Sequence, residues 1–388
     1  MNRRHRGLIL AAGIVLAAAS ALAQVKVGVT LSTTGAAASL GIPARNAITL
    51  LPRSIAGQAI EYILLDDASD PVGAVKNVRR LLTEDKVDVV VGSSTTPNSL
   101  AMIDAVAEAS TPMISMASSV RIVEPMDAKH RWIFKVVHND SLQMATMVSH
   151  MAANKVAKVG VVLVNDAYGE GLFTEFEKIA ATRKLSVVSQ ERFGRTDTTA
   201  LAQVLKVMAS QPDAVLVAAA GTPAALPAKT LRERGYKGRI YFTDGVVNDD
   251  FLRVGGRDVE GAFLPSGLFI VAKQLPDNNP SKAVAMDFIR RHDAAFPPGT
   301  ANHFSGHAWT VGLLLQKAVP HALTKGKPGS VEFRRALREG LEKTSELVTA
   351  QGVMNMSPKD HVGYDQRAST MVTIEGGTWK LAKQPGLP

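Results

Sequence analysis

Two short segments rich in small hydroxyl residues are the first candidates for chemistry in this chain of 388 residues. The segment 92–97 reads Gly-Ser-Ser-Thr-Thr-Pro, and the segment 115–119 reads Ser-Met-Ala-Ser-Ser. Each follows a short apolar run, and the first opens a helix-like stretch. Backbone N–H groups at a helix start, with hydroxyls beside them, suit a carboxylate or a phosphate. Ordinary helix capping needs only one such residue, so two hydroxyl-rich loops favour a ligand site.

Two further segments place single polar side chains behind apolar runs. Tyr168 lies in the segment Asn-Asp-Ala-Tyr-Gly-Glu-Gly, where it can close over a ligand or simply pack at a surface. Asp244 lies in Thr-Asp-Gly, where it can meet a cationic group or serve as a turn residue or helix cap.

Signatures of catalysis are scarce. The sequence contains no Gly-x-Ser-x-Gly, no Gly-x-x-x-x-Gly-Lys-Ser/Thr and no His-Glu-x-x-His. His303 and His307 are spaced to share a helix face, but no third metal ligand is evident, so capping or packing is the favoured interpretation. Asp66, Asp67 and Asp70 lack the glycine and the distal glutamate of a calcium loop. We therefore expect no enzyme, no metal and no cofactor.

The loops need a scaffold, and the alternation of elements predicts parallel sheets. From Gln24 onward, short β-branched runs alternate with helical stretches, first over 25–116 and again over 133–243. Apolar strands separated by helices indicate an α/β protein with parallel sheets covered on both faces. Loops at the carboxyl ends of such strands meet at one edge, where ligands bind. Three long helical stretches and a hairpin near Val372–Leu381 follow, so we expect two lobes between which the chain crosses more than once.

Composition and charge narrow the class of protein. The absence of cysteine excludes a disulfide, a thiolate metal site, a thiol nucleophile and a lipidated N-terminal cysteine. The formal net charge is +9, but the densest basic stretch, 229–239, has a single tyrosine and no interleaved aromatic pattern, so no nucleic-acid partner is expected.

The first 23 residues have the three parts of a cleavable signal peptide. Arg3, Arg4 and Arg6 precede a short apolar run, which ends on Ala-Leu-Ala before Gln24. An uncleaved anchor is the alternative, although the run is close to the lower length limit for a span. We expect a mature chain from about Gln24 that diffuses in a periplasm, without a stable membrane anchor and as a monomer.

At these loops the chain resembles the periplasmic solute-binding proteins of ABC transporters, specifically the Leu/Ile/Val-binding (type I) family. The similarity covers nearly all of the mature chain, in order, and its motifs are individually weak but numerous. They are the opening Val-Lys-Val-Gly at 25–28, the turn at 66–71, the loops at 92 and 114–118, Asp-Ala-Tyr-Gly at 166–169, Pro-Asp-Ala at 212–214 and the segment 254–261.

The resemblance implies two doubly wound parallel-sheet lobes, joined by three crossover strands, that close on a small solute. It implies an N-terminal lobe of residues 24–138 plus 270–348 and a C-terminal lobe of 139–269 plus 349–388. Carried over by motif, the solute's carboxylate meets Thr95, Thr96, Ala117 and Ser118, and Tyr168 covers it from the opposite lobe. The resemblance also places Asp244 where amino-acid binders hold an acidic residue against the α-ammonium group.

Two departures from the family pattern leave the solute open. The segment 218–223 (Ala-Ala-Ala-Gly-Thr-Pro) lacks the aromatic residue that amino-acid binders commonly carry there, and the family's cysteine pair is absent. The leading hypothesis is capture of a branched-chain or other hydrophobic amino acid for delivery to a cognate ABC transporter permease. The alternatives are an aromatic or other organic acid or an amide, a sensor that presents its closed form to a signalling receptor, and, more distantly, an exported hydrolase.

Overall fold

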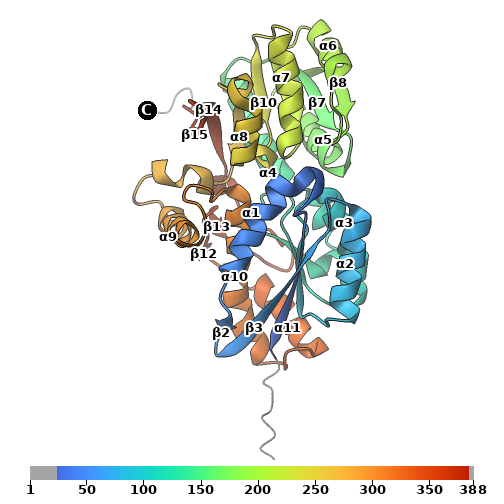
Figure 1. Ribbon diagram of the computed structural model, residues 1–388, viewed down its shortest axis with the longest axis vertical. Helices are drawn as coiled ribbons and strands as arrows, with labels where there is room; N and C mark the ends of the chain where they lie inside the picture. Colours follow the sequence, from blue (N-terminus) through green and yellow to red (C-terminus); the bar gives the residue numbers. More distant parts are fainter. Residues whose placement is uncertain (1–23, 384–388) are drawn as a thin grey trace, which may run out of the picture.

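The computed structural model describes residues 24–383, and within them the chain forms two α/β lobes stacked along the long axis (Figure 1). The expected signal peptide lies outside the described residues. Among the described residues, no helix combines the length and the apolar character needed to span a bilayer.

The first lobe is built on a six-stranded sheet with parallel pairing throughout, apart from one hairpin. In sheet order, its strands are β2 (Ser54–Ile55), β3 (Gln58–Asp66), β1 (Val25–Leu31), β4 (Val89–Gly92), β5 (Met113–Ser115) and β6 (Ile133–Lys135). Its helices are α1 (Ala38–Thr49), α2 (Pro71–Thr83), α3 (Thr96–Glu108), α9 (Pro280–Ala295), α10 (His303–Leu323) and α11 (Val331–Glu342).

Burial on both faces explains why β4 is apolar at every position. Val89 and Val91 pack with α1, α10 and α11, whereas Val90 packs on the other face with α2 and α3. Successive side chains of a strand point to opposite faces, so a sheet covered on both sides needs this continuous run. The helix α2 begins as its sequence predicts, with Pro71 at the first position and the Asp70 carboxylate accepting from the Gly73 N–H at 3.0 Å.

The second lobe contains a seven-stranded sheet whose last two strands are antiparallel. In sheet order, its strands are β15 (Thr378–Leu381), β14 (Thr370–Glu375), β11 (Phe263–Ser266), β10 (Arg239–Phe242), β9 (Ala214–Ala218), β7 (Lys158–Val164) and β8 (Ser186–Phe193). Its helices are α4 (Asp140–Ala153), α5 (Ala167–Thr182), α6 (Leu201–Ala209), α7 (Ala225–Glu233) and α8 (Asp249–Gly255). Two parallel-sheet lobes confirm the predicted fold class, and β14 and β15 form the predicted hairpin.

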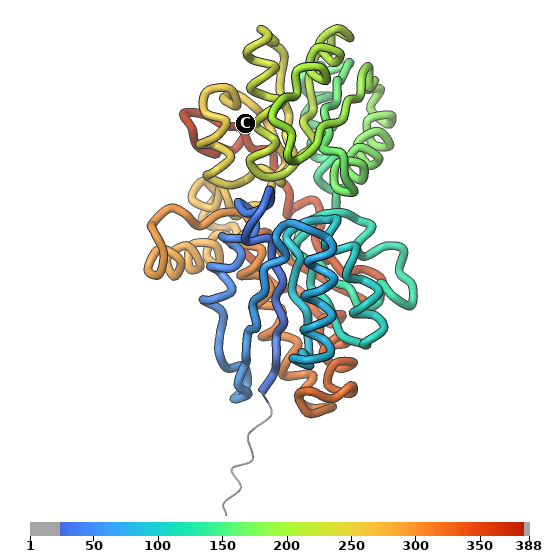
Figure 2. The backbone as a smooth tube through the Cα atoms, turned by 45° about the vertical axis from the view of Figure 1, so that its right-hand side comes forward, coloured from blue at the N-terminus to red at the C-terminus, as the bar shows by residue number. Residues whose placement is uncertain are grey.

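The chain passes between the lobes more than once, as the colours along the tube in Figure 2 show. It enters the second lobe between β6 and α4, and after β11 it returns to pack α9 on the first lobe. Leu347, Met354 and Met356 also pack in the core of the first lobe, and the chain next joins the second sheet at Thr370. We therefore propose that the third crossing lies within 365–369, later than the predicted boundary at 348–349.

A buried carboxylate ties together the strand ends that carry the first hydroxyl-rich loop. Asp67 is fully buried after β3, and it accepts hydrogen bonds from the hydroxyls of Ser32 at 2.7 Å and Ser93 at 2.6 Å. It also accepts from the Ser69 N–H at 3.0 Å. These contacts join the carboxyl ends of β1, β3 and β4, so they set the position of the loop that precedes α3.

We expect Asp67→Ala to lower the free energy of unfolding by about 2–4 kcal/mol, because it leaves two buried hydroxyls and one N–H without their acceptor. Urea unfolding followed by circular dichroism measures this loss. The matched control is Asp104→Ala, which removes an exposed carboxylate paired only with Lys129 and should cost less than about 1 kcal/mol. Equal effects of the two substitutions would contradict the assignment.

Candidate functional site

A cavity lies between the lobes, and it gathers all six residues predicted to contact a solute. These are Thr95, Thr96, Ala117, Ser118, Tyr168 and Asp244. The other lining residues are Leu40, Ser94, Met116, Val137, Arg195, Ala220, Gly245, His303, Phe304 and His307. Their common location is observed, whereas their contact with a solute stays a prediction.

The lobes touch across this cavity. Leu40 of α1 and Phe304 of α10 pack with the core of the second lobe, and the space beside the Gly221 Cα is filled by the Leu40 side chain. A side chain at 221 would also be strained, because Gly221 has a φ of +69°. The site therefore lies between both lobes, and most of its lining side chains are buried.

The start of α3 offers hydrogen-bond donors that the protein itself does not use. Thr95 is the N-cap residue, yet its side chain makes no capping hydrogen bond, and the buried Thr96 hydroxyl has no partner in the protein. By contrast, α5 is capped in the ordinary way by Asp166, which accepts from the N–H groups of Tyr168 and Gly169. The start of a 13-residue helix without a side-chain cap, at the wall of this cavity, has the chemistry that suits an anion.

A fully buried lysine holds the second hydroxyl-rich loop from behind. The Lys135 ammonium donates to the carbonyl oxygen of Ser118 and, at 3.1 Å, to that of Ser119. Burial lowers the pKa of Lys135 to about 8, although the nearby Asp140 opposes this shift. Burial likewise raises the pKa of Asp140 to about 6. The lysine thus fixes the loop that brings Ala117 and Ser118 to the cavity, a role that its place inside β6 did not reveal.

Tyr168 contributes a ring and an acceptor rather than a donor. Its hydroxyl lies 2.7 Å from the Thr243 hydroxyl, and Thr243 itself donates to the carbonyl oxygen of Ala219 at 3.0 Å. The Tyr168 hydroxyl therefore donates its proton to the Thr243 oxygen, and the phenol oxygen keeps a lone pair that can accept a hydrogen bond. Gly245 permits this arrangement, because a Cβ there would come within 2.5 Å of the Tyr168 oxygen.

Asp244 is already contacted by two side chains of the protein. Its Oδ2 accepts from the Gln143 amide at 2.7 Å, and the His303 Nε2 lies 3.5 Å from the same oxygen. Gln143 comes from α4 of the second lobe and His303 from the start of α10. Sequence reasoning missed both residues, because they lie about 100 and 60 positions away from Asp244 along the chain.

Arg195 is a further residue that sequence reasoning missed, and it is the cationic group that lines the cavity. Its Nε donates to the Asp166 carboxylate at 2.5 Å, and its Nη1 is buried without a partner in the protein. The guanidinium is thus held in place on one side and free on the other. The sequence did contain an indication of this role. Arg195 lies two residues after the end of strand β8, and parallel sheets place ligand-binding side chains at such strand ends.

Three histidines meet where the lobes join. His303 and His307 have ring centroids 4.2 Å apart, and His138, from the first crossing, lies 6.3 Å from His307 and stacks on Tyr364 at 4.4 Å. His303 and His307 are buried, as the packing interpretation requires, but they also line the cavity, and the helix cap is Asn302 instead. Among residues 24–383, no group of three or more potential ligands is arranged to hold a metal ion.

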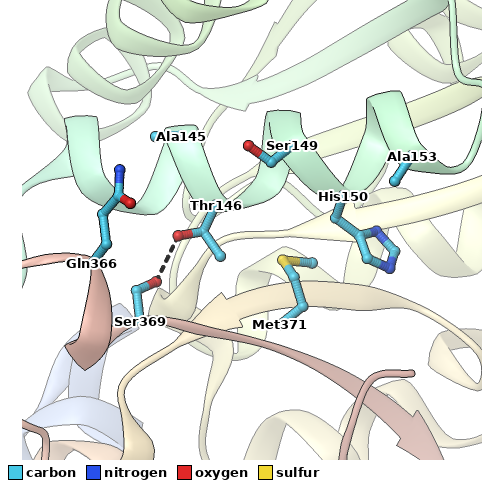
Figure 3. Close-up of a pocket in the computed structure, with 8 residues that line it drawn as sticks. All are labelled: Ala145, Thr146, Ser149, His150, Ala153, Gln366, Ser369 and Met371. Atoms are coloured by element: carbon cyan, nitrogen blue, oxygen red, sulfur yellow. Dashed lines mark hydrogen bonds between the residues drawn. The ribbon is translucent and has the colours of Figure 1, made fainter. Parts of the chain in front are cut away.

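A separate hollow lies on the second lobe between α4 and the residues that lead into β14 (Figure 3). Three of its polar side chains, those of Thr146, Ser369 and His150, already pair with other groups of the protein. Thr146 and Ser369 are joined at 2.9 Å, and His150 lies 3.0 Å from the Tyr241 hydroxyl. We assign it no role.

Two doubly wound lobes with a polar cavity between them are the architecture of a solute-binding protein. The sequence profile described as "Periplasmic binding protein" matches residues 24–378, so the chain belongs to this family. Its relatives are solute-binding proteins rather than enzymes. Family members bind small-molecule solutes and work with ABC transporter permeases, and membership implies a periplasmic location.

The relatives agree with the Leu/Ile/Val-binding branch of the family. An extracellular ligand-binding receptor from Rhodopseudomonas palustris HaA2 is 41% identical, with a TM-score of 0.91 over 93% of this chain and 100% of that one. The "Leu/Ile/Val-binding protein homolog 2" of Brucella abortus (strain 2308) is 25% identical over 86% of this chain and 87% of its own length.

Two more distant solved structures share the fold alone. One is the substrate-binding protein LivJ from Streptococcus pneumoniae in complex with isoleucine (21% identity, TM-score 0.78, 92% and 98% covered). The other is an R. palustris solute-binding protein in complex with benzoate (19% identity, TM-score 0.78, 92% and 95% covered).

The buried histidines predict a loss of stability in acid. Burial, with help from the neighbouring His303 and Lys135, lowers the pKa of His138 to about 3. The unfolded chain binds a proton at this residue below about pH 6.5 and the folded chain does not, so His138 alone destabilises the fold by about 2 kcal/mol at pH 5 relative to pH 7.

We therefore expect the loss of stability between pH 7 and pH 5 to be about 2 kcal/mol smaller in His138→Phe than in the unmodified chain. Urea unfolding at both pH values measures it. Asp140 titrates in the same range with the opposite sign, but it is present in both proteins and cancels. Identical pH slopes would show that His138 titrates normally.

Proposed function

We propose that this protein is the substrate-binding component of an ABC importer that captures a small carboxylate-bearing solute by lobe closure and delivers it to a cognate permease. The observation that supports this proposal is the pair of anion-binding groups that face one cavity from different lobes. The uncapped start of α3 belongs to the first lobe, and the half-free guanidinium of Arg195 belongs to the second.

A carboxylate that touches both groups makes closure depend on the ligand. In the open form a solute can meet only one lobe, so the closed form gains the second contact and the equilibrium shifts toward it. Closure also excludes water, which strengthens the attraction between the carboxylate and the guanidinium. The protein acts as a monomer in this scheme, because each chain contains both halves of the site.

The same cavity favours an organic acid over a zwitterion. Asp244, the group expected to hold an ammonium, is already approached by Gln143 and His303. The segment after β9 is Ala-Ala-Gly, so no aromatic side chain fills that side of the cavity, and Ala220 lines it. A hydrophobic amino acid remains the second candidate function, since Asp244 is the one carboxylate that lines the cavity.

Arg195→Met tests the carboxylate anchor. A charge-assisted hydrogen bond contributes about 1.5–3 kcal/mol, so the variant should bind carboxylic acids about 10- to 150-fold more weakly. The solutes are first identified by thermal shift against carboxylic acids, their amides and amino acids, where a ligand at about 100 times its dissociation constant stabilises by about 2.7 kcal/mol. Isothermal calorimetry then measures the affinities.

The matched control is Arg192→Met, which removes an exposed arginine of the preceding strand β8 that pairs with Glu170 outside the cavity. It should leave the affinity unchanged. Tight binding of amides and not of acids, or equal affinities of the two variants, would refute the carboxylate anchor.

Uptake of the identified solute by cells with and without this protein tests delivery to a permease, and intact uptake in its absence would favour the sensor alternative.

Asp244→Asn separates the two candidate solute classes. If an α-ammonium contacts Asp244, the variant should lose at least about tenfold in affinity for leucine-like ligands, because it removes a buried charge pair. Simple carboxylic acids should bind the variant about as well as the unmodified protein. Comparison of leucine with 4-methylpentanoate by calorimetry measures this difference, and equal losses for both ligands would refute the amino-acid version.

A further inference from the structure

We propose that His303, His307 and Asp244 form a second polar subsite that binds a hydroxyl group of the solute, so that the ligand is a hydroxylated carboxylic acid. This inference rests on the proposed function, and it deepens that function by naming the second group that the cavity recognises.

The three side chains form a contiguous row on the cavity wall. The His303 Nε2 lies 3.5 Å from the Asp244 Oδ2, and the rings of His303 and His307 are 4.2 Å apart between centroids. All three residues are at least 97% buried, and all three line the same cavity as the two anion-binding groups. They come from both lobes, so closure assembles this subsite as well.

The ring nitrogens of His303 and His307 leave at least one hydrogen-bond donor and one acceptor free to contact a ligand. The His303 Nδ1 lies 3.4 Å from the Gln351 amide nitrogen, which is a donor, so the tautomer with the proton on Nε2 fits this contact. The contact from Nε2 to Asp244 is too long for a good hydrogen bond. Neither ring nitrogen of His307 has a partner in the protein.

His307 is neutral in this setting. Burial, together with the rings of His303 and His138, lowers the pKa of His307 well below its usual value. A neutral imidazole carries one N–H and one lone pair, so His307 can donate one hydrogen bond and accept another.

A hydroxyl is the group that fits this pattern. It accepts from a histidine N–H and donates to the His307 lone pair or to Asp244. A second carboxylate can only accept, and it would lie beside the Asp244 carboxylate, whose negative charge repels it. An ammonium can only donate, so it would face the N–H of His303.

A buried histidine without partners is not a ligand site by itself, and the chain contains an instructive contrast. His292 in α9 is equally buried, and both of its ring nitrogens lack a hydrogen bond, but it packs between Phe288 and Phe296 and does not line the cavity. His303 and His307 differ because they lie on the wall of a cavity that already contains anion-binding groups.

The test compares ligands that share one carbon skeleton and differ in one group. Two series serve: 4-methylpentanoate, its 2-hydroxy derivative and leucine; and benzoate, 4-hydroxybenzoate and 4-aminobenzoate. Calorimetry on the full mature chain gives the three affinities of each series. In at least one series, we expect the hydroxy acid to bind at least about tenfold tighter than both the unsubstituted acid and the amine.

The variant His307→Phe keeps the ring and removes both hydrogen-bonding groups. It should reduce the preference for the hydroxy acid, taken as the ratio of the two affinities in that variant, to about threefold or less. His292→Phe is the matched control and should preserve the preference. Thermal unfolding of each variant checks its fold, and the comparison among ligands on the unmodified protein stands even where a variant fails to fold.

The outcomes separate this inference from the function on which it rests. Binding of carboxylic acids that is lost in Arg195→Met, without any preference for the hydroxy acid, would overturn the subsite and leave the proposed function intact. Tighter binding of the amine would likewise overturn the hydroxyl and favour the amino-acid version. If no carboxylic acid binds at all, both proposals are wrong.

Discussion

Closure of two lobes over polar side chains is the physical constraint on which this structure depends. A polar group that loses water and gains no partner costs about 1–3 kcal/mol, and the cavity holds several such groups from both lobes. Thr96 comes from the first lobe and Arg195 from the second, and each has a buried atom without a partner in the protein. We propose that the closed arrangement is favourable only when a solute in the cavity supplies the missing acceptors, and that this couples solute binding to lobe movement.

The remaining architecture places those groups and holds them still. Parallel strands bring the loops after β4 and β5 to one edge of the first sheet, and Asp67 joins the neighbouring strand ends through the hydroxyls of Ser32 and Ser93. Lys135 fixes the 117–119 loop in the same way, because its ammonium donates to two carbonyl oxygens of that loop. In the second lobe, Asp166 both caps α5 and holds Arg195. Each ligand-facing group is thus supported by a buried or half-buried partner that does not face the ligand.

The sequence predicted the parts of the site that follow from local pattern. The hydroxyl-rich loops were found because each directly follows an apolar strand, and Tyr168 and Asp244 were found for the same reason. The fold class followed from the alternation of strands and helices, which is also a local property. Their common location in one cavity required only the rule that carboxyl ends of parallel strands share an edge.

The parts that sequence reasoning missed depend on contacts between distant segments. Gln143 and His303 reach Asp244 from α4 and α10, and no local pattern marks them as its neighbours. The segment 349–364 was expected in the second lobe, but Met354 and Met356 find their apolar partners in the first. Arg195 is different, because it follows β8 and satisfies the strand-end rule. No run of basic residues marks Arg195, because its place at the cavity follows from its position after the strand alone.

Division of one anion site between two lobes also suits a protein that must release its solute. A guanidinium and a helix start that face each other across a dry cavity attract a carboxylate strongly, because the effective dielectric constant there is low. Once the lobes separate, water reaches both groups, the attraction falls several-fold, and each group is solvated without help from the solute. Tight capture and easy release therefore need no change in the side chains themselves. The proposed trap needs only a hinge, and the short crossings between the two sheets are the candidates for it.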